Sequence, residues 1–141
     1  MTGVLVVTGA SRGIGAAAAR IAAREGFAVC LNAARSIEAT RKLAAEIVAG
    51  GGRAISVQAD VGRREEVDAM FATVDRELGT VTALINNAAI VGPERRLGDV
   101  DAELLREIFT TNVDSVFWCT AAAARRMSTA QGGKAARAVP S

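Results

Sequence analysis

Short runs of apolar residues alternate along the chain with longer stretches in which apolar residues recur at helical spacing. A short apolar run bounded by turn residues predicts a buried strand, whereas the longer period predicts a helix with one buried face. The predicted strands are residues 3–8, 27–32, 54–58 and 81–86. The predicted helices are residues 15–25, the stretch between a cap at Ser36 and the glycines of 50–52, residues 67–78, and the stretch from a cap at Asp101 to about Met127.

Each predicted strand is separated from the next by a predicted helix. Neighbouring strands therefore pair in parallel, because a parallel crossover needs a dozen or more residues. Right-handed crossovers give an open, doubly wound α/β sheet with helices on both faces. The alternation covers residues 1–127, which form one predicted domain. Residues 128–141 have neither a strand signal nor a helical face and are predicted to be an irregular tail.

The helical periodicity also predicts which apolar side chains face the core. They are Ala18, Ile21, Ala22, Leu43, Ile47, Val48, Val67, Met70, Phe71, Val74, Leu78, Leu104, Leu105, Ile108, Val116 and Phe117. On this pattern the last helix buries large side chains along most of its length.

The 141 residues include no histidine and no tyrosine. The composition excludes a histidine general base, a serine–histidine triad and a tyrosine acid, which are common proton-transfer arrangements. A zinc site is not expected, because two cysteines without histidine leave mostly carboxylate ligands. Cys30 and Cys119 lie in apolar segments and are predicted to be buried free thiols, as expected in a reducing cytosol.

The formal net charge is +2, from 17 basic and 15 acidic residues, and the sequence has no dense basic stripe. Nucleic acid is therefore not an expected partner. Residues 1–7 lack the charged start and long apolar run of a secretory signal. No uncharged apolar stretch approaches the ~20 residues that span a membrane. These features predict a soluble cytoplasmic protein.

The sequence TGASRGIG, residues 8–15, follows a predicted strand and opens a predicted helix. Glycines let the backbone turn sharply and approach a pyrophosphate, and the free N–H groups at the helix start then favour the anion. We therefore predict a dinucleotide-binding turn, with a merely structural turn as the alternative. The predicted cofactor contacts in it are Gly9, Ser11, Arg12, Gly13, Ile14 and Gly15.

Residues 32–36, after the second predicted strand, include no carboxylate that could accept a hydrogen bond from a ribose 2′-hydroxyl. Arg35 in this segment, together with Arg12, can instead bind a 2′-phosphate. The pair favours NADP over NAD as the cofactor. The alternative is that both arginines are solvated surface charges.

Further polar positions stand at the ends of predicted strands and inside the last helix. Asp60, followed by Val61, can accept a hydrogen bond from an adenine amino group, or it can cap the next helix. Asn86 and Ala88 follow the fourth strand at the same edge of the sheet, where they can line a cofactor crevice or form an ordinary turn. Asn112 lies among apolar residues of a predicted helix, where a structural asparagine with satisfied hydrogen bonds is the simplest interpretation.

Together these segments resemble the short-chain dehydrogenase/reductase family over residues 3–127. The resemblance implies a Rossmann-like parallel sheet with strand order 3-2-1-4 and a bound nicotinamide cofactor. It also implies hydride transfer to or from a small-molecule carbonyl or alcohol. Arg12 and Arg35 resemble the basic residues of the family members that prefer NADP.

The resemblance also assigns roles to individual residues. The glycines of residues 8–15 become pyrophosphate contacts, Asp60 becomes an adenine contact, and Asn86 becomes a cofactor-crevice residue. Asn112 becomes the catalytic asparagine of the family, which holds a water in the proton relay.

Members of the family form homo-oligomers, so the resemblance implies self-association through the last helix. The aromatic and branched side chains that would face a partner subunit are Phe109, Val113, Phe117 and Trp118. The fourth strand is expected to be an unpaired edge, because the family places a fifth strand beside it. Exposed edges and apolar helix faces promote association, either specific or as aggregation.

The chain departs from the family pattern at two places. Ala89 stands where the family usually has glycine. The family's remaining catalytic residues, a serine and Tyr-x-x-x-Lys, have no counterpart, since the chain has no tyrosine. Ser141 is not expected to be that serine, because no apolar strand precedes it. The chain therefore resembles the truncated N-terminal half of a member about 250 residues long.

Three functions are consistent with the sequence. The chain is an NADP-dependent oxidoreductase by descent, a non-catalytic dinucleotide-binding module, or a truncated product without function. A frameshift after Lys134 is one hypothesis for the tail, because a shifted reading of plausible codons restores a strand-like sequence. The sequence does not indicate the substrate.

Overall fold

The structure, a computed structural model, describes residues 2–131 and follows the predicted alternation of strands and helices. The strands are β1 (Gly3–Val7), β2 (Phe27–Ala33), β3 (Arg53–Gln58) and β4 (Ala83–Ile85). The helices are α1 (Gly13–Arg24), α2 (Ile37–Ala49), α3 (Arg64–Glu77), α4 (Ala102–Phe109) and α5 (Ser115–Met127).

Three short helical turns complete the described chain. A π-helical turn, Thr110–Asp114, joins α4 to α5, and 3-10 turns occupy Leu97–Asp99 and Thr129–Gln131. The last of these lies in the predicted irregular tail. The rest of that tail, residues 132–141, and with it the site of the hypothetical frameshift, lies outside the described residues.

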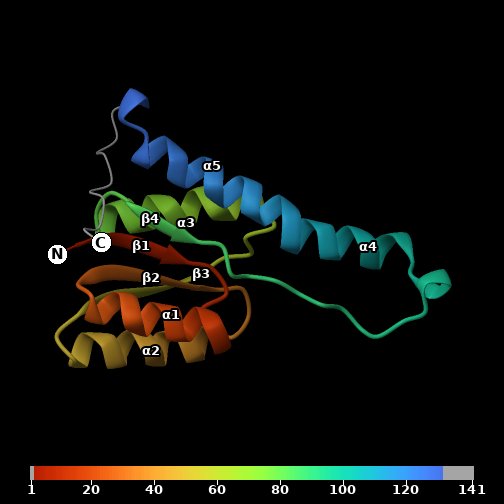
Figure 1. Cartoon of the computed structure of the whole chain (residues 1–141), viewed down its shortest axis with the longest axis horizontal. Helices are drawn as coiled ribbons and strands as arrows, with labels where there is room; N and C mark the ends of the chain where they lie inside the picture. Colours follow the sequence, from red (N-terminus) through yellow and green to blue (C-terminus); the bar gives the residue numbers. More distant parts are fainter. Residues whose placement is uncertain (1, 132–141) are drawn as a thin grey trace, which may run out of the picture.

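All strand pairs are parallel, in the order β3-β2-β1-β4, which confirms the predicted doubly wound, Rossmann-like sheet. Figure 1 shows α1 and α2 on one face of the sheet and α3 and α5 on the other. β4 is shorter than predicted, because beyond Ile85 the backbone N–H of Asn87 donates to the side chain of Thr8 instead of continuing the ladder. Within residues 2–131, β4 pairs only with β1 and is an edge of the sheet.

The alternation of side chains along β1 divides the core into two clusters. Val4 and Val6 pack with residues of α3 and α5, whereas Leu5 and Val7 pack with residues of α1 and α2. The buried face predicted for residues 67–78 is confirmed in full: Val67, Met70, Phe71 and Val74 of α3 and Leu78 at its C-cap are buried. Both faces of the sheet are therefore covered, as a parallel sheet requires.

The two predicted helix caps have different outcomes. Oδ1 of Asp101 accepts a hydrogen bond from the backbone N–H of Leu104 at 2.8 Å, so Asp101 caps α4 as predicted. Ser36 occupies the N-cap position of α2, as predicted, but its side chain makes no cap hydrogen bond. Asp101 has the extended backbone typical of a cap, with ψ 166°, whereas Ser36 has ψ 53°.

The predicted core faces of α1 and α2 are only partly correct. Leu43 and Ile47 are buried, but Ile21 and Val48 are more than half exposed. In α1 the side chains that face the sheet are the small ones of Ala16 and Ala19. Small residues bring the helix close to the strands, and the larger Ile21 is left on the outer side.

The prediction for the last helix was wrong in two respects. The π-helical turn interrupts it, and Leu105, Val116 and Phe117 are 50%, 40% and 68% exposed. The side chains that α5 buries are mostly small: Ser115, Cys119, Ala122 and Ala123. An added residue in a π turn rotates the following helix about its axis, so one apolar stripe cannot face the core on both sides of the turn. Figure 1 shows α4 extending beyond the sheet, where it has little core to cover.

Both cysteines are free and buried, as predicted. Burial raises the pKa of the Cys30 thiol to about 12, with a smaller contribution from the negative charge of Glu77, and burial raises that of Cys119 to about 11. Both thiols therefore stay protonated near neutral pH and are not nucleophiles. Among the helices of residues 2–131, none is long and apolar enough to cross a membrane.

Candidate functional site

A cleft of about 870 Å³ opens at the carboxyl ends of the strands. Its walls come from the turn after β1, the ends of β2 and β3, the loop after β4, and the polar side of α4. At this edge the chain leaves β1 toward β2 on one side and leaves β4 toward α4 on the other, and open α/β sheets bind ligands where neighbouring strands diverge in this way.

Most of the predicted cofactor residues line this cleft. They are Gly9, Ser11, Arg12, Gly13, Ile14, Arg35, Asp60, Val61 and Ala88. Gly15, Asn86 and Asn112 were predicted as site residues as well, but none of the three is among the lining residues. The structure thus brings together residues from four separate segments of the sequence.

The glycines of the turn after β1 are required by its backbone and by its surroundings. Gly9 and Gly13 have φ of 61° and 60°, a region that side chains rarely adopt. A Cβ on Gly9 would lie 2.7 Å from the Cα of Ala88, whereas a Cβ on Gly13 would meet no atom within 4 Å. Gly15 is buried, and a Cβ there would lie 2.5 Å from Nδ2 of Asn87. Gly9 and Gly15 therefore shape the turn, and Gly13 keeps its outer side open.

The N-terminus of α1 faces this cleft without a side-chain cap. Arg12 occupies the N-cap position and makes no cap hydrogen bond, and the first turn of α1 has no acidic residue. The first N–H groups of a helix have no partner within the helix, so they can bind an anion. The exposed side chain of Ile14 adds an apolar surface at the same end. The residues present therefore fit a dinucleotide with its pyrophosphate at this helix start.

The loop after β4 is tied to the glycine turn by side-chain hydrogen bonds. The hydroxyl of Thr8 accepts from the backbone N–H groups of Asn87 and Ala88, at 3.0 Å each. Nδ2 of Asn87 donates to the carbonyl of Gly9 at 2.8 Å. Asn87 therefore joins the loop after β4 to the glycine turn. Asn86 instead donates to Oγ1 of Thr120 on α5 at 3.1 Å.

Two arginines stand at the opening of the cleft. Arg12 and Arg35 both line it, and both are exposed. Within the described part of the chain neither arginine is in an ion pair, so both guanidinium groups can bind an external anion. Among the described residues that line the cleft, Asn32 is the one buried polar side chain, and the sequence pattern did not single it out.

Asp60 lies in the cleft after β3, next to the buried Val61. Its Oδ1 accepts from the backbone N–H of Gly62 at 2.9 Å, and its own N–H donates to Oε1 of Glu66 at 3.1 Å. α3 begins four positions further on, at Arg64, with Arg63 at the N-cap, so Asp60 is not the helix cap of the alternative interpretation. It holds the turn that brings this segment to the cleft.

Asn112 lies in the π-helical turn and binds the loop after β4 through both ends of its amide. Oδ1 accepts from the N–H of Ile90 at 2.8 Å, and Nδ2 donates to the carbonyl of Ile90 at 2.7 Å. Asn112 therefore makes the hydrogen bonds that a structural asparagine is expected to make. Its amide keeps a second N–H and a second acceptor lone pair, so these bonds do not test the catalytic role that the resemblance implies.

Ala89, the departure from the family pattern, lines the cleft without backbone strain. It is exposed, and no residue other than glycine has a positive φ within residues 2–131.

Helix α4 contributes a wall of the cleft that the sequence did not predict. Its polar side and the following π turn supply Glu103, Arg106, Glu107, Thr110 and Thr111. The amphipathic pattern of α4 was available in the sequence, but a polar helix face is usually solvated, and only the fold shows what it borders.

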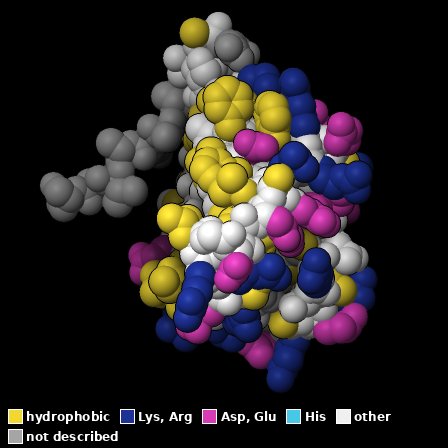
Figure 2. Space-filling model, turned by 90° about the vertical axis from the view of Figure 1, so that its right-hand side faces the viewer, with side chains coloured by type: hydrophobic (Ala, Val, Ile, Leu, Met, Phe, Trp, Pro, Cys, Tyr) yellow, Lys and Arg dark blue, Asp and Glu magenta, His cyan; other side chains and the backbone are white. Residues whose placement is uncertain are grey.

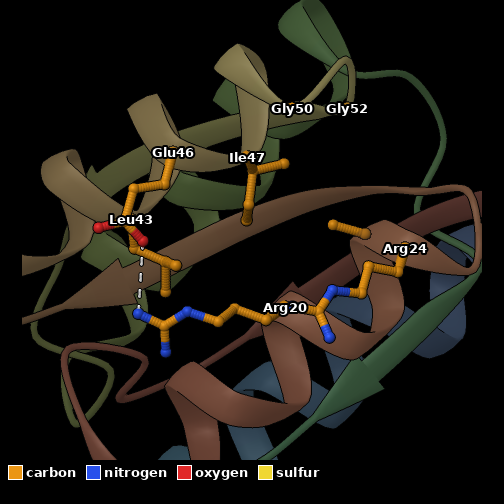
Figure 3. A pocket seen from close by; sticks show the side chains of 8 residues that line it. Arg20, Arg24, Leu43, Glu46, Ile47, Gly50 and Gly52 are labelled. Carbon is orange, nitrogen blue, oxygen red and sulfur yellow. Dashed lines mark hydrogen bonds and ion pairs between the residues drawn. The ribbon is translucent and has the colours of Figure 1, made fainter.

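A second, smaller hollow of about 320 Å³ lies between α1 and α2 (Figure 3). Leu43 and Ile47 form its apolar floor, and Arg20 is paired there with Glu46 at 3.5 Å. It lies toward the C-terminal ends of both helices, at the end of the strands opposite to the glycine turn (Figure 1). It offers no free helix N-terminus, so the larger cleft is the candidate site.

The sequence profile described as short chain dehydrogenase matches residues 3–137. The chain belongs to the short chain dehydrogenase family. The match extends past residue 127, where the alternating pattern predicts the domain to end.

Individual members of the family support the match. L-rhamnose 1-dehydrogenase (NAD(P)(+)) of Azotobacter vinelandii is 40% identical over 140 residues, which are 97% of this chain and 54% of the relative. A short chain dehydrogenase from Burkholderia cenocepacia, solved in complex with NADP, is 36% identical with a TM-score of 0.81. The matched region is 86% of this chain and 49% of the relative. An alcohol dehydrogenase from Thermococcus sibiricus, complexed with 5-hydroxy-NADP, is 33% identical with a TM-score of 0.83 and covers 93% and 55%.

The chain spans about half the length of the curated relatives it matches. The half that it shares with them contains the glycine turn and the cleft.

Proposed function

We propose that this chain binds NADP(H) and is the cofactor-binding part of a short chain dehydrogenase that acts on a carbonyl or an alcohol. The observation that carries the proposal is the uncapped start of α1, reached through a glycine turn and flanked by two unpaired arginines in one cleft. When bound, the nicotinamide supplies or accepts the hydride.

Each part of the cleft has a role in holding the cofactor. The N–H groups at the start of α1 bind the pyrophosphate, and Gly13 leaves space for it. Arg12 and Arg35 bind the 2′-phosphate through charge-assisted hydrogen bonds. The segment of Asp60 and Val61 borders the adenine. Asn112 acts indirectly, by fixing the loop at Ile90.

The charges of the cleft favour NADP(H) over NAD(H). Residues 32–36 offer no carboxylate to a ribose 2′-hydroxyl, and Arg35 lies at their end of the cleft. Isothermal titration of the purified chain with NADPH and with NADH tests this proposal. We expect saturable binding of NADPH at one site and binding of NADH that is roughly tenfold weaker or more. Absence of binding by either dinucleotide would refute the proposal.

The isolated 141-residue chain is expected to show little or no turnover. It contains no tyrosine and no histidine, and general acid catalysis contributes about 10²–10⁴ to such rates. NADPH oxidation, followed by the loss of nicotinamide absorbance with simple ketones and aldehydes, should match a protein-free blank. Oxidation that rises in proportion to the chain's concentration would contradict this expectation.

The same absence favours a second function, a dinucleotide-binding module that performs no chemistry. This alternative predicts NADPH binding without turnover under any condition. A complete enzyme instead predicts that turnover appears when the chain is supplied with the segment that relatives carry beyond this half. Reading the gene past residue 141 decides between the two: a serine and Tyr-x-x-x-Lys in either frame favours the enzyme.

We also propose that the chain self-associates through the exposed side of α4 and α5. Figure 2 shows hydrophobic side chains gathered on the face where α4 lies. The exposed apolar residues of these two helices and the turn between them are Leu105, Phe109, Val113, Val116 and Phe117.

A double substitution of Phe109→Glu and Phe117→Glu is expected to weaken this self-association roughly 100-fold or more, because each ring loses a buried position in the interface. Sedimentation velocity over a range of concentrations measures the effect. Leu97→Glu is the matched control, because Leu97 is 91% exposed but lies in the loop before α4. A wild-type chain that stays monomeric at high concentration would contradict the proposal.

A further inference from the structure

Asn32 is a buried polar residue at the carboxyl end of β2, with 1% of its surface exposed. It lies between the glycine turn that follows β1 and the end of β3 that leads to Asp60. A buried amide is costly unless both its donor and its acceptor have partners. The partners of Asn32 therefore show what the residue does.

The side chain of Asn32 binds the glycine turn on one side and β3 on the other. Oδ1 accepts from the N–H of Gly9 at 3.3 Å, and Nδ2 donates to the carbonyls of Val57 and Ala59 at 3.3 and 3.0 Å. The backbone carbonyl of Asn32 also accepts from the N–H of Ala10 at 2.8 Å. Asn32 thus holds two successive N–H groups of the glycine turn, those of Gly9 and Ala10. It also holds two carbonyls of the segment that leads to Asp60.

A primary amide of this size meets both requirements of the site at once. The group must accept on the side of Gly9 and donate on the side of Ala59. A leucine of similar volume would do neither, and a carboxylate would accept from Gly9 but place a negative oxygen against two carbonyls. β1 and β3 each pair with β2 but not with each other, and the side chain of Asn32 adds a direct link between the glycine turn and the end of β3.

We infer that Asn32 is a positioning residue that sets the distance between the two halves of the dinucleotide site, the phosphate-binding turn and the strand end that carries Asp60. This inference rests on the proposed function, because it concerns how the same cleft holds NADP(H). A ligand that spans two subsites gains affinity when they are held at its own length. Replacing Asn32 should therefore lower the affinity for the whole dinucleotide more than it lowers the affinity for fragments that occupy one subsite.

The test compares NADP⁺ with two fragments, 2′-AMP and inorganic pyrophosphate, by isothermal titration of the full chain. Asn32→Leu keeps the volume without charge, and Asn32→Asp keeps only the acceptor. For both variants at about pH 8 we expect NADP⁺ to bind roughly tenfold more weakly or worse. For the neutral Asn32→Leu variant, the affinity for each fragment should stay within about threefold of wild type.

The Asn32→Asp variant adds a readout that general destabilisation would not produce. A buried carboxyl keeps its proton to higher pH than an exposed one, and the protonated group can donate to the carbonyl of Ala59. The affinity of this variant for NADP⁺, relative to wild type, should therefore recover between about pH 8 and about pH 5. Gln58→Glu is the matched control: it makes the same chemical change on an exposed side chain of the neighbouring strand and should show no such recovery.

The outcomes separate this inference from the proposed function. If wild type binds NADP⁺ and both folded variants bind it as tightly at every pH, Asn32 does not position the site and the proposed function stands. If the variants lose the fragments as much as NADP⁺, the role is structural and the inference is wrong. If wild type binds neither NADP⁺ nor the fragments, the proposed function itself fails. Circular dichroism of each variant establishes that it is folded.

Discussion

The substitution Gly9→Ala is expected to lower the affinity for NADPH roughly 100-fold or more. The new Cβ would lie 2.7 Å from the Cα of Ala88, a backbone atom that cannot rotate away. It would also force a side chain into a backbone with φ of 61°, which costs about 1–2 kcal/mol. Either the turn or the loop at Ala88 must move, and the N–H groups at the start of α1 then lose their place in the cleft.

The matched control for this prediction is Gly51→Ala. Gly51 has φ of 90°, but a Cβ there meets no atom within 4 Å, and the residue lies between α2 and β3, outside the cleft. Both substitutions should lower the melting temperature, whereas only Gly9→Ala should abolish NADPH binding, as measured by isothermal titration. Equal NADPH affinity in the two folded variants would show that the glycine turn does not hold the cofactor.

Replacing Arg12 and Arg35 together with alanine is expected to remove the preference for NADPH. A hydrogen bond to a charged group contributes about 1.5–3 kcal/mol, so each substitution should weaken NADPH binding roughly 10- to 100-fold. Binding of NADH, which has no 2′-phosphate, should change by less than about threefold. The affinity ratio between the two dinucleotides, measured by competition titration, is the quantity that must fall.

Arg24→Ala controls for the loss of positive charge. Arg24 belongs to α1, the helix whose first turn faces the cleft, but it lies in the last turn of that helix. Its loss should leave the ratio of NADPH to NADH affinity unchanged. If the double substitution at Arg12 and Arg35 weakens both dinucleotides equally, these arginines attract anions in general and do not recognise the 2′-phosphate.

The fold was predictable where the apolar residues at helical spacing are also the residues that pack against the sheet. On α3 the apolar positions recur at helical spacing and all of them meet the sheet, so sequence and structure coincide. On α5 they do not, because the π-helical turn at Thr110–Asp114 changes the phase of the helix and places Ala122 and Ala123 in the core instead of Phe117. A change of phase of this kind leaves no trace in a periodicity count.

The candidate site was predictable where backbone conformation dictates the residue. A turn that needs positive φ at Gly9 and Gly13 is visible in the sequence, because glycine is almost the only residue that fits. Choosing between neighbouring asparagines was not possible, since consecutive residues point in different directions: Asn87 reaches the turn and Asn86 reaches α5. Asn32 was missed because its role depends on contacts between segments far apart in the sequence.

The position of the dinucleotide in the cleft is tested most directly by the amide chemical shifts of the ¹⁵N-labelled chain on titration with NADPH. We expect the largest changes on the backbone N–H groups of residues 9–15 and of Arg35, with smaller changes at Asp60. Changes confined to the hollow between α1 and α2, at Arg20, Arg24 and Ile47, or no changes at saturating NADPH, would contradict it.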